Sequence, residues 1–212
     1  MFEGIFSQSI IARAQTANLV KIKIINIRDF GQGPRKNVDD KPYGGGKGMV
    51  LRVDIVAKAL KTLKPKPYLI LLSASGKKYD QKMAQMFSKK QSLALICGHY
   101  EGIDARAEKF VDGVISIGDF VLSGGEIAAM AIIDSVTRLV PGVIHPKSLS
   151  SESFSQISNL LEYPQYTRPK EFQGLKVPKI LLSGNHQEIE KWREQQAFKR
   201  TKKYRPGLLK KF

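Results

Sequence analysis

Two short, almost wholly apolar runs constrain the fold of this chain more than any other feature. Residues 68–73 (YLILLS) and 93–97 (LALIC) are each bounded by turn-forming residues. Such runs are typical of strands that are buried on both faces of a parallel sheet. Between them, residues 83–89 have the apolar spacing of a helix. The order strand, helix, strand predicts an α/β unit.

The other elements are predicted from the same two periodicities, about 3.6 residues for a helix and two for a strand. We predict helices over residues 5–18, 53–63, 125–139 and 187–201. We predict a half-exposed strand over residues 20–27, where Val and Ile alternate with Lys and Asn, and a short strand over residues 114–117. A polar, glycine-rich loop separates the first strand from the second helix.

The composition changes after about residue 141, where Ser, Pro and polar residues replace the apolar pattern. We therefore predict three parts: an α/β domain over residues 1–144, a flexible linker over 145–159 and a small basic helical domain over 160–212.

The charge balance indicates a polyanionic partner. The 212 residues include 35 Lys and Arg against 19 Asp and Glu, a formal net charge of +16. Such a positive field attracts nucleic acid. A basic membrane-surface protein is the alternative, but no segment resembles an amphipathic basic anchor.

Several protein classes are disfavoured by composition. A single cysteine, Cys97, allows no internal disulfide and suits a reducing cytoplasm. No apolar run is long enough to span a bilayer, and no secretory signal is visible. Three dispersed histidines give no spacing for a zinc site, so we predict no metal held by protein ligands alone.

Glycines and polar groups gather in three stretches: residues 38–49, 97–106 and 116–126. The first lacks the Gly-Lys-Ser/Thr ending of a phosphate-binding P-loop, and the third differs from the Gly-x-Gly-x-x-Gly dinucleotide fingerprint. The second and third each follow a predicted strand. Since ligands of open α/β sheets bind outside the carboxyl ends of strands, two such turns predict a ligand pocket.

These stretches also resemble a known family. VDDKPYGGGKGM, LICGHYEGIDAR, SIGDFVLSGGE, LEYPQYTRP and LLSGNHQEIEKWR are similar, in order and across the chain, to signature blocks of the TrmD family. This family comprises the bacterial tRNA (guanine-N1)-methyltransferases of the SPOUT class. The resemblance implies a parallel α/β sheet with a C-terminal trefoil knot, followed by a small helical C-terminal domain.

The resemblance further implies that S-adenosylmethionine is the methyl donor and binds in the knot. The residues that it assigns to the donor are Leu72, Gly98, Tyr100, Gly102, Ile117, Gly118, Asp119, Phe120, Val121, Leu122, Ser123, Gly124 and Gly125. Glycines allow a ligand to approach the backbone, and branched apolar side chains can enclose an adenine.

By the same resemblance the enzyme is a homodimer that methylates N1 of the guanosine 3′ of the tRNA anticodon, at position 37. We expect Asp40, Tyr43 and Gly45 to contact tRNA, together with Lys199, Arg200 and Lys202, which would bind phosphates. For any single lysine of this tail, a solvated surface role is the competing interpretation.

Methylation of N1 requires removal of its proton, because guanine N1 is protonated at neutral pH. The family places an aspartate in the linker for this role, and here Glu152 occupies the matching position. Arg138 matches a family arginine that stabilises charge on guanine O6. The competing interpretations are a solvated carboxylate for Glu152 and a helix cap for Arg138.

Two further expectations come from the resemblance. Mg²⁺ dependence is a family property, although no protein-only cage of ligands is visible here. Family members also have a strand and a Phe-Pro-Glu-Met-Phe-like turn before the first helix, whereas this chain opens at Met1-Phe2. We therefore expect the first strand to be missing, which would leave a gap in the sheet.

Two alternative functions follow from these observations. The chain could be another SPOUT methyltransferase that acts on a ribose hydroxyl or a different base, although the YTRP and GNHQEIEKWR blocks argue against it. It could also be a tRNA-binding protein without catalysis, a hypothesis motivated by Glu152 and by the missing strand.

Overall fold

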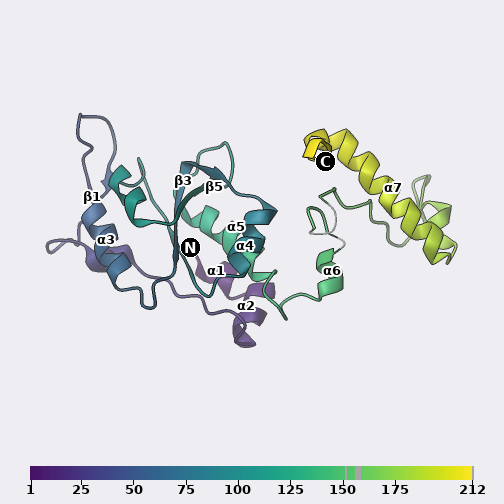
Figure 1. The fold of residues 1–212 in the computed structure, drawn as a ribbon, viewed down its shortest axis with the longest axis horizontal. Helices are drawn as coiled ribbons and strands as arrows, with labels where there is room; N and C mark the ends of the chain where they lie inside the picture. The colour runs from purple at the N-terminus through teal and green to yellow at the C-terminus, as the bar shows by residue number, and fades with distance from the viewer. Residues whose placement is uncertain (151, 156–158, 212) are drawn as a thin grey trace. The chain divides into compact units, whose positions relative to one another are not determined.

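A computed structural model describes residues 1–150, 152–155 and 159–211 of the chain (Figure 1). The chain divides into two compact units, Met1–Ile144 and His145–Phe212. Residues 145–159, the predicted linker, fall in the second unit. Ser151 and residues 156–158 of that segment lie outside the described residues.

The first unit is built on a parallel three-stranded sheet with the order β4-β3-β5. Its helices and strands are α1 (Glu3–Phe6), α2 (Ser9–Thr16), β1 (Asp39–Asp40), β2 (Val50–Leu51), α3 (Val53–Lys61), β3 (Tyr68–Lys78), α4 (Gln81–Ser88), β4 (Leu93–Ile96), β5 (Gly113–Ser116) and α5 (Glu126–Thr137). Short 3₁₀ turns occupy Ile27–Phe30 and Ala105–Phe110. The predicted mixed α/β class with a parallel sheet is confirmed.

Both faces of this sheet are covered, which explains why the first half of β3, residues 69–72, is apolar at every position. Leu71 packs in a cluster with Ile55 and Val56 of α3. Its neighbours in the strand, Ile70 and Leu72, pack on the opposite face with residues of α4 and α5. Figure 1 shows α3 on one side of β3, and α4 and α5 on the other. Burial of both faces removes the alternation that a half-exposed strand would have.

β3 is longer than predicted because its second half changes register against β5. The pairing passes from Leu72 opposite Ile115 directly to Lys77 opposite the same residue. The intervening residues bulge out, and Gly76 lies so close that an added Cβ would be 2.4 Å from the backbone nitrogen of Ile115. The bulge places Ser73 and Ala74 beyond the end of the regular pairing.

The prediction of a strand over residues 20–27 is wrong. Residues 20–26 form no strand, and the chain then enters the 3₁₀ turn at Ile27. A strand requires a hydrogen-bonded partner, and none of the described segments pairs with these residues. Ile24 is therefore 54% exposed. Alternation predicted the side-chain pattern here but carried no information about a partner.

The predicted helix over residues 5–18 is divided into α1 and α2. Ser9 has a φ of +54°, a conformation that interrupts an α-helix. The two pieces still bury one apolar face, since Phe6 and Ile11 pack against Met130 of α5. The apolar spacing therefore predicted the buried face correctly and missed the break.

The second unit contains α7 (His186–Tyr204) and a hairpin of β6 (Glu171–Phe172) and β7 (Leu175–Lys176). α6 (Pro146–Ser150) begins it, and 3₁₀ turns occupy Lys179–Leu182 and Pro206–Lys211. The hairpin turn has positive φ at Gln173 and Gly174, as tight two-residue hairpins require. None of the helices among the described residues has the length and apolar character needed to cross a bilayer.

Candidate functional site

A cavity of about 250 Å³ lies at the carboxyl ends of the three parallel strands. Three segments form most of it: the residues after β4, the residues between β5 and α5, and the β3 bulge. The carboxyl end of a parallel sheet is where open α/β proteins bind ligands. The geometry thus brings together the two glycine-rich turns, residues 97–106 and 116–126, which nine residues separate in the sequence.

All the residues predicted to bind the donor line this cavity except Asp119. Asp119 points elsewhere: its carboxylate pairs with Lys78 (Nζ to Oδ2 3.0 Å), and its side chain is 89% exposed. Leu72, Ile117 and Leu122 supply apolar wall, and glycines form much of the remainder.

Bare backbone is required at several positions of this cavity. A Cβ added to Gly125 would lie 2.8 Å from the Cα of Cys97, and one added to Gly98 would lie 2.8 Å from a side-chain carbon of Ile103. The Gly125 N–H donates to the Gly98 carbonyl oxygen at 2.9 Å, so the two turns are in direct contact. Larger residues would push these turns apart.

Sequence reasoning missed several lining residues, among them His99, Ala74, Asp104 and Glu108, whereas the family resemblance places Leu71 and Ser73 at this strand end. Ala74 could have been found, because it follows a predicted buried strand just as the glycine turns do. Asp104 and Glu108 could not, since their place depends on how the turn after Ile103 folds back. Together with Glu101 they make one side of the cavity acidic.

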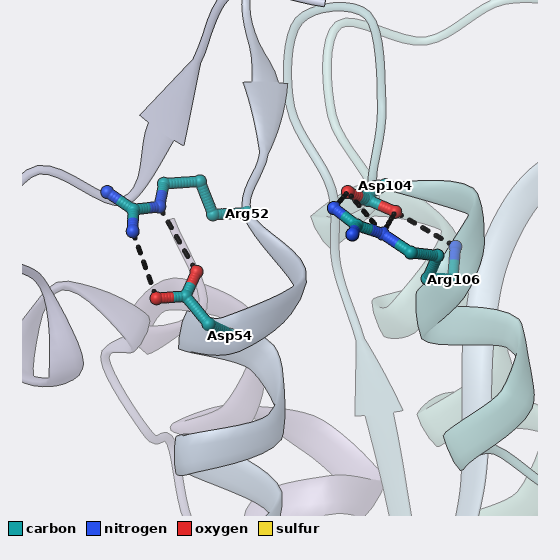
Figure 2. A network of polar contacts seen from close by, with 4 residues as sticks. All are labelled: Arg52, Asp54, Asp104 and Arg106. Atoms are coloured by element: carbon teal, nitrogen blue, oxygen red, sulfur yellow. Dashed lines mark hydrogen bonds and ion pairs between the residues drawn. The ribbon is translucent and has the colours of Figure 1, made fainter.

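Two arginine–aspartate pairs brace the region beside this acidic side (Figure 2). The Arg106 guanidinium donates to Asp104 at 2.6 Å, and Arg52 donates to Asp54 at 3.0 Å. Hydrogen bonds from Arg106 lower the pKa of Asp104, and Arg52 likewise lowers the pKa of Asp54. Both carboxylates are therefore ionised at neutral pH.

The glycine-rich loop over residues 41–48 lies next to the cavity turn, because the strands that carry it are bonded to that turn. The Leu51 N–H donates to Gly102, and the Glu101 N–H donates to Met49. Of the predicted tRNA-contact residues in this loop, Tyr43 is fully exposed, and Gly45 has a φ of +81°. Asp40, in β1, is also exposed.

The remaining predicted residues lie outside the cavity. Arg138 caps the C-terminus of α5 in the first unit. Glu152 is half-buried in the second unit, as are its neighbours Ser153 and Phe154. Lys199, Arg200 and Lys202 lie exposed on α7.

Charge is segregated along α7. In its first half, Lys191 and Arg193 pair with Glu188 and Glu190. Its second half and the residue after it carry Lys199, Arg200, Lys202, Lys203 and Arg205 without an acidic residue. No ion pair found among the described residues involves these five cations. Such a surface is suited to polyanion binding.

The thiol of Cys97 has a strongly raised pKa. Burial, reinforced by the charge of Glu126, raises the pKa of the Cys97 thiol to about 12. The thiol is thus protonated at neutral pH and serves as a packing residue behind the cavity, where Gly125 contacts it.

The parallel sheet and its glycine-lined cavity define an α/β protein with a ligand pocket at the strand ends. The profile of tRNA (guanine-1)-methyltransferase TrmD matches residues 1–211. The chain therefore belongs to the TrmD family, as the sequence motifs predicted, and by family it is a methyltransferase.

Curated relatives carry the name tRNA (guanine-N(1)-)-methyltransferase. One from Dictyoglomus turgidum is 53% identical over 213 residues, which cover 100% of this chain and 86% of the relative. One from Caldanaerobacter subterraneus is 52% identical, over 100% of this chain and 88% of the relative. One from Thermus thermophilus is 48% identical, over 95% of this chain and 84% of the relative.

Proposed function

We propose that this enzyme transfers a methyl group from S-adenosylmethionine to N1 of guanosine 37, the residue 3′ of the anticodon in tRNA. The observation that carries the proposal is the single cavity into which the two glycine-rich turns converge. The family match supplies the reaction, since TrmD members are tRNA (guanine-1)-methyltransferases.

The residues of the cavity fit the donor. Leu72, Ile117 and Leu122 offer an apolar slot for an adenine, and the glycine turns offer backbone groups. Glu101 and Glu108 offer carboxylates to the ribose hydroxyls and the ammonium group of the donor, while the Asp104 carboxylate is bonded to Arg106. When bound, the donor supplies an electrophilic methyl group on a sulfonium.

Glu152 and Arg138 are the residues that we assign to the chemistry. Glu152 takes the N1 proton, the freed N1 lone pair forms the new N–C bond, and the sulfonium leaves as a neutral thioether. Arg138 donates hydrogen bonds to guanine O6, where negative charge gathers once the proton has left.

RNA binding belongs, in this proposal, to two surfaces. Asp40, Tyr43 and Gly45 of the exposed loop contact the anticodon region, and Lys199, Arg200 and Lys202 bind phosphates. The support is the exposure of Tyr43 and the unpaired basic half of α7. The C-terminal domain predicted from the sequence, residues 160–212, then acts as the tRNA-binding domain, joined through the linker 145–159.

Two finer features also come from the family resemblance: a SPOUT trefoil knot around the donor and a homodimer. A cytoplasmic location is a further part of the proposal, supported by the single cysteine. Light scattering of the purified enzyme tests the dimer directly, with a mass of about twice 23.7 kDa expected.

A Mg²⁺ requirement is the least supported part of the proposal. Among the described residues, no group of three or more His, Cys, Asp or Glu could hold a metal ion. Methyl transfer measured with EDTA and with added Mg²⁺ tests the requirement.

The test of the function is methyl transfer from labelled S-adenosylmethionine to bacterial tRNA that carries G37. We expect label in the tRNA, recovered as 1-methylguanosine, and none when position 37 is replaced by another base. Glu152→Ala should reduce kcat by about 10²- to 10⁴-fold, the usual range for a general base. Transfer that persists without G37 would favour a different SPOUT activity, and tRNA binding without transfer would favour a non-catalytic protein.

A further inference from the structure

Three contacts hold together the turn after β4 and the turn before α5. The backbones of His99 and Gly124 pair as an isolated bridge, and the Gly125 N–H donates to the Gly98 carbonyl oxygen at 2.9 Å. The third contact joins side chains: His99 Nε2 lies 2.6 Å from Glu126 Oε1. No regular strand pairing reinforces these turns in the described chain, so these contacts set their separation.

Of the His99–Glu126 pair, His99 lines the cavity and Glu126 does not. The Glu126 side chain is only 17% exposed, and its Oε2 is buried without a hydrogen-bond partner among the described atoms. A Cβ added to Gly124 would lie 2.5 Å from that oxygen and 2.7 Å from the His99 ring. The pair therefore packs directly on the bare backbone of Gly124.

Glu126 is held from a second direction. It is the first residue of α5, where the exposed N–H groups and the helix dipole favour a carboxylate. The position of Glu126 is therefore set by the start of α5. The hydrogen bond to His99 thus joins the turn of residues 98–102 to the start of α5.

His99 links this anchor to the donor-binding wall. Its side chain is 48% exposed and lines the cavity, and its ring centre lies 6.1 Å from that of Tyr100. Tyr100 has a φ of +56°, a conformation that a tyrosine adopts only when its surroundings enforce it. The backbone just after this residue is held by two hydrogen bonds, from the Glu101 N–H to Met49 and from the Gly102 N–H to His99.

We propose that His99 and Glu126 form a positioning pair that sets the affinity for the methyl donor, by holding the 98–102 turn at the distance the donor requires. The inference rests on the proposed function, because it assumes that the cavity binds the donor. Neither side chain is placed at the reacting atoms, so the pair acts through Gly98, Tyr100 and Gly102.

The decisive comparison is between two substitutions of similar bulk. His99→Gln keeps an N–H near the position of Nε2, whereas His99→Leu fills the space without a donor. Glu126→Ala and the double variant His99→Leu/Glu126→Ala complete a cycle. Lys36→Ala is the matched control, since it removes an exposed ion pair of the same unit with Asp29 that does not line the cavity.

Affinity is measured by calorimetric titration of S-adenosylhomocysteine, the unreactive product, into each full-length protein. We expect His99→Leu and Glu126→Ala each to weaken binding about 5- to 20-fold, the equivalent of one charge-assisted hydrogen bond. The double variant should be no weaker than either single variant. His99→Gln and Lys36→Ala should bind within about twofold of the parent protein.

Steady-state kinetics separate positioning from general damage. The KM for S-adenosylmethionine should rise in His99→Leu while the KM for tRNA stays unchanged. The proposal would be overturned if His99→Leu bound S-adenosylhomocysteine as tightly as the parent protein. It would also be overturned if His99→Gln bound it as weakly as His99→Leu. Failure of the parent protein itself to bind S-adenosylhomocysteine would instead overturn the proposed function.

Discussion

Gly125 shows how closely the residues of the cavity depend on one another. Its N–H is bonded to Gly98, and it lies against the backbone of Cys97, where no side chain would fit. The motif Ser-Gly-Gly-Glu therefore records a close approach of two chain segments. Its glycines could be read from the sequence as a ligand turn, but the contact that requires Gly125 could not, because it involves a residue of another motif.

Gly125→Ala should destabilise the first unit and weaken donor binding together. The added methyl would lie 2.8 Å from the Cα of Cys97, so the turns must separate. We expect the free energy of unfolding to fall by about 1–3 kcal/mol, the usual cost of overpacking. Chemical denaturation measures it, with Gly113→Ala as the control because an added Cβ there meets nothing within 4 Å. An unchanged midpoint for Gly125→Ala would contradict the packing described here.

Cys97 should make stability depend on pH on the alkaline side. Its pKa rises from 9.0 to about 12 on folding, so the unfolded chain loses the proton first as pH increases. The contribution of the protonated Cys97 thiol to the free energy of unfolding is fully present below pH 9 and is lost as the pH rises toward 12. Between pH 8 and pH 10 the free energy of unfolding should fall by about 1 kcal/mol more in the parent than in Cys97→Ala. Parallel pH profiles of the two proteins would show that burial of the thiol has no such effect.

At the scale of elements, sequence patterns predicted what was local and missed what depended on a partner. The helices near α3, α4, α5 and α7 were found because each has its own apolar spacing or cap. Asp80, for example, caps α4 by accepting from the Met83 N–H at 2.9 Å. Residues 20–26 failed as a strand because alternation says nothing about a neighbour, and the β3 bulge failed because it arises from the register against β5.

α7 is joined to the preceding segment through one buried hydroxyl. Thr201 is fully buried, accepts the Leu161 N–H at 2.9 Å and donates to the Ala197 carbonyl oxygen at 2.8 Å. Thr201→Val preserves the shape but removes the acceptor. It should therefore cost about 1–3 kcal/mol, the penalty for an unsatisfied N–H.

Thermal unfolding of the full-length protein measures this cost, and hydrogen exchange of the Leu161 amide shows whether the loss arises at this hydrogen bond. Thr201→Ser keeps the hydroxyl and should recover most of the loss. Exchange of the Leu161 amide that is equally slow in Thr201→Val and the parent would show that the hydrogen bond does not hold the segment.

At the scale of the whole molecule, the cavity and the basic surface are carried by different units. The cavity belongs to the first unit, whereas the unpaired basic half of α7 belongs to the second. The overall charge of +16 indicated a polyanion but could not locate its site. The local sequence narrows the site to the second half of α7. In the first half, Glu188 and Glu190 stand three residues before Lys191 and Arg193 and pair with them.

Neutralising the basic half of α7 should weaken tRNA binding without changing the affinity for the methyl donor. For Lys199→Gln/Arg200→Gln/Lys202→Gln we expect the slope of log affinity against log salt to become shallower by about 2, given about 0.7–0.9 for each phosphate contact. Lys191→Gln is the control on the same helix, because Lys191 is already paired with Glu188. A salt dependence equal to that of the parent would remove this surface from RNA binding.

The account depends most on the cavity at the strand ends being the donor site. Hydrogen exchange with and without S-adenosylhomocysteine tests this directly, since bound ligand slows exchange of the amides that it covers. We predict protection in residues 98–104 and 117–125, with little change in 186–204. Tight binding with protection confined to other segments would contradict the assignment.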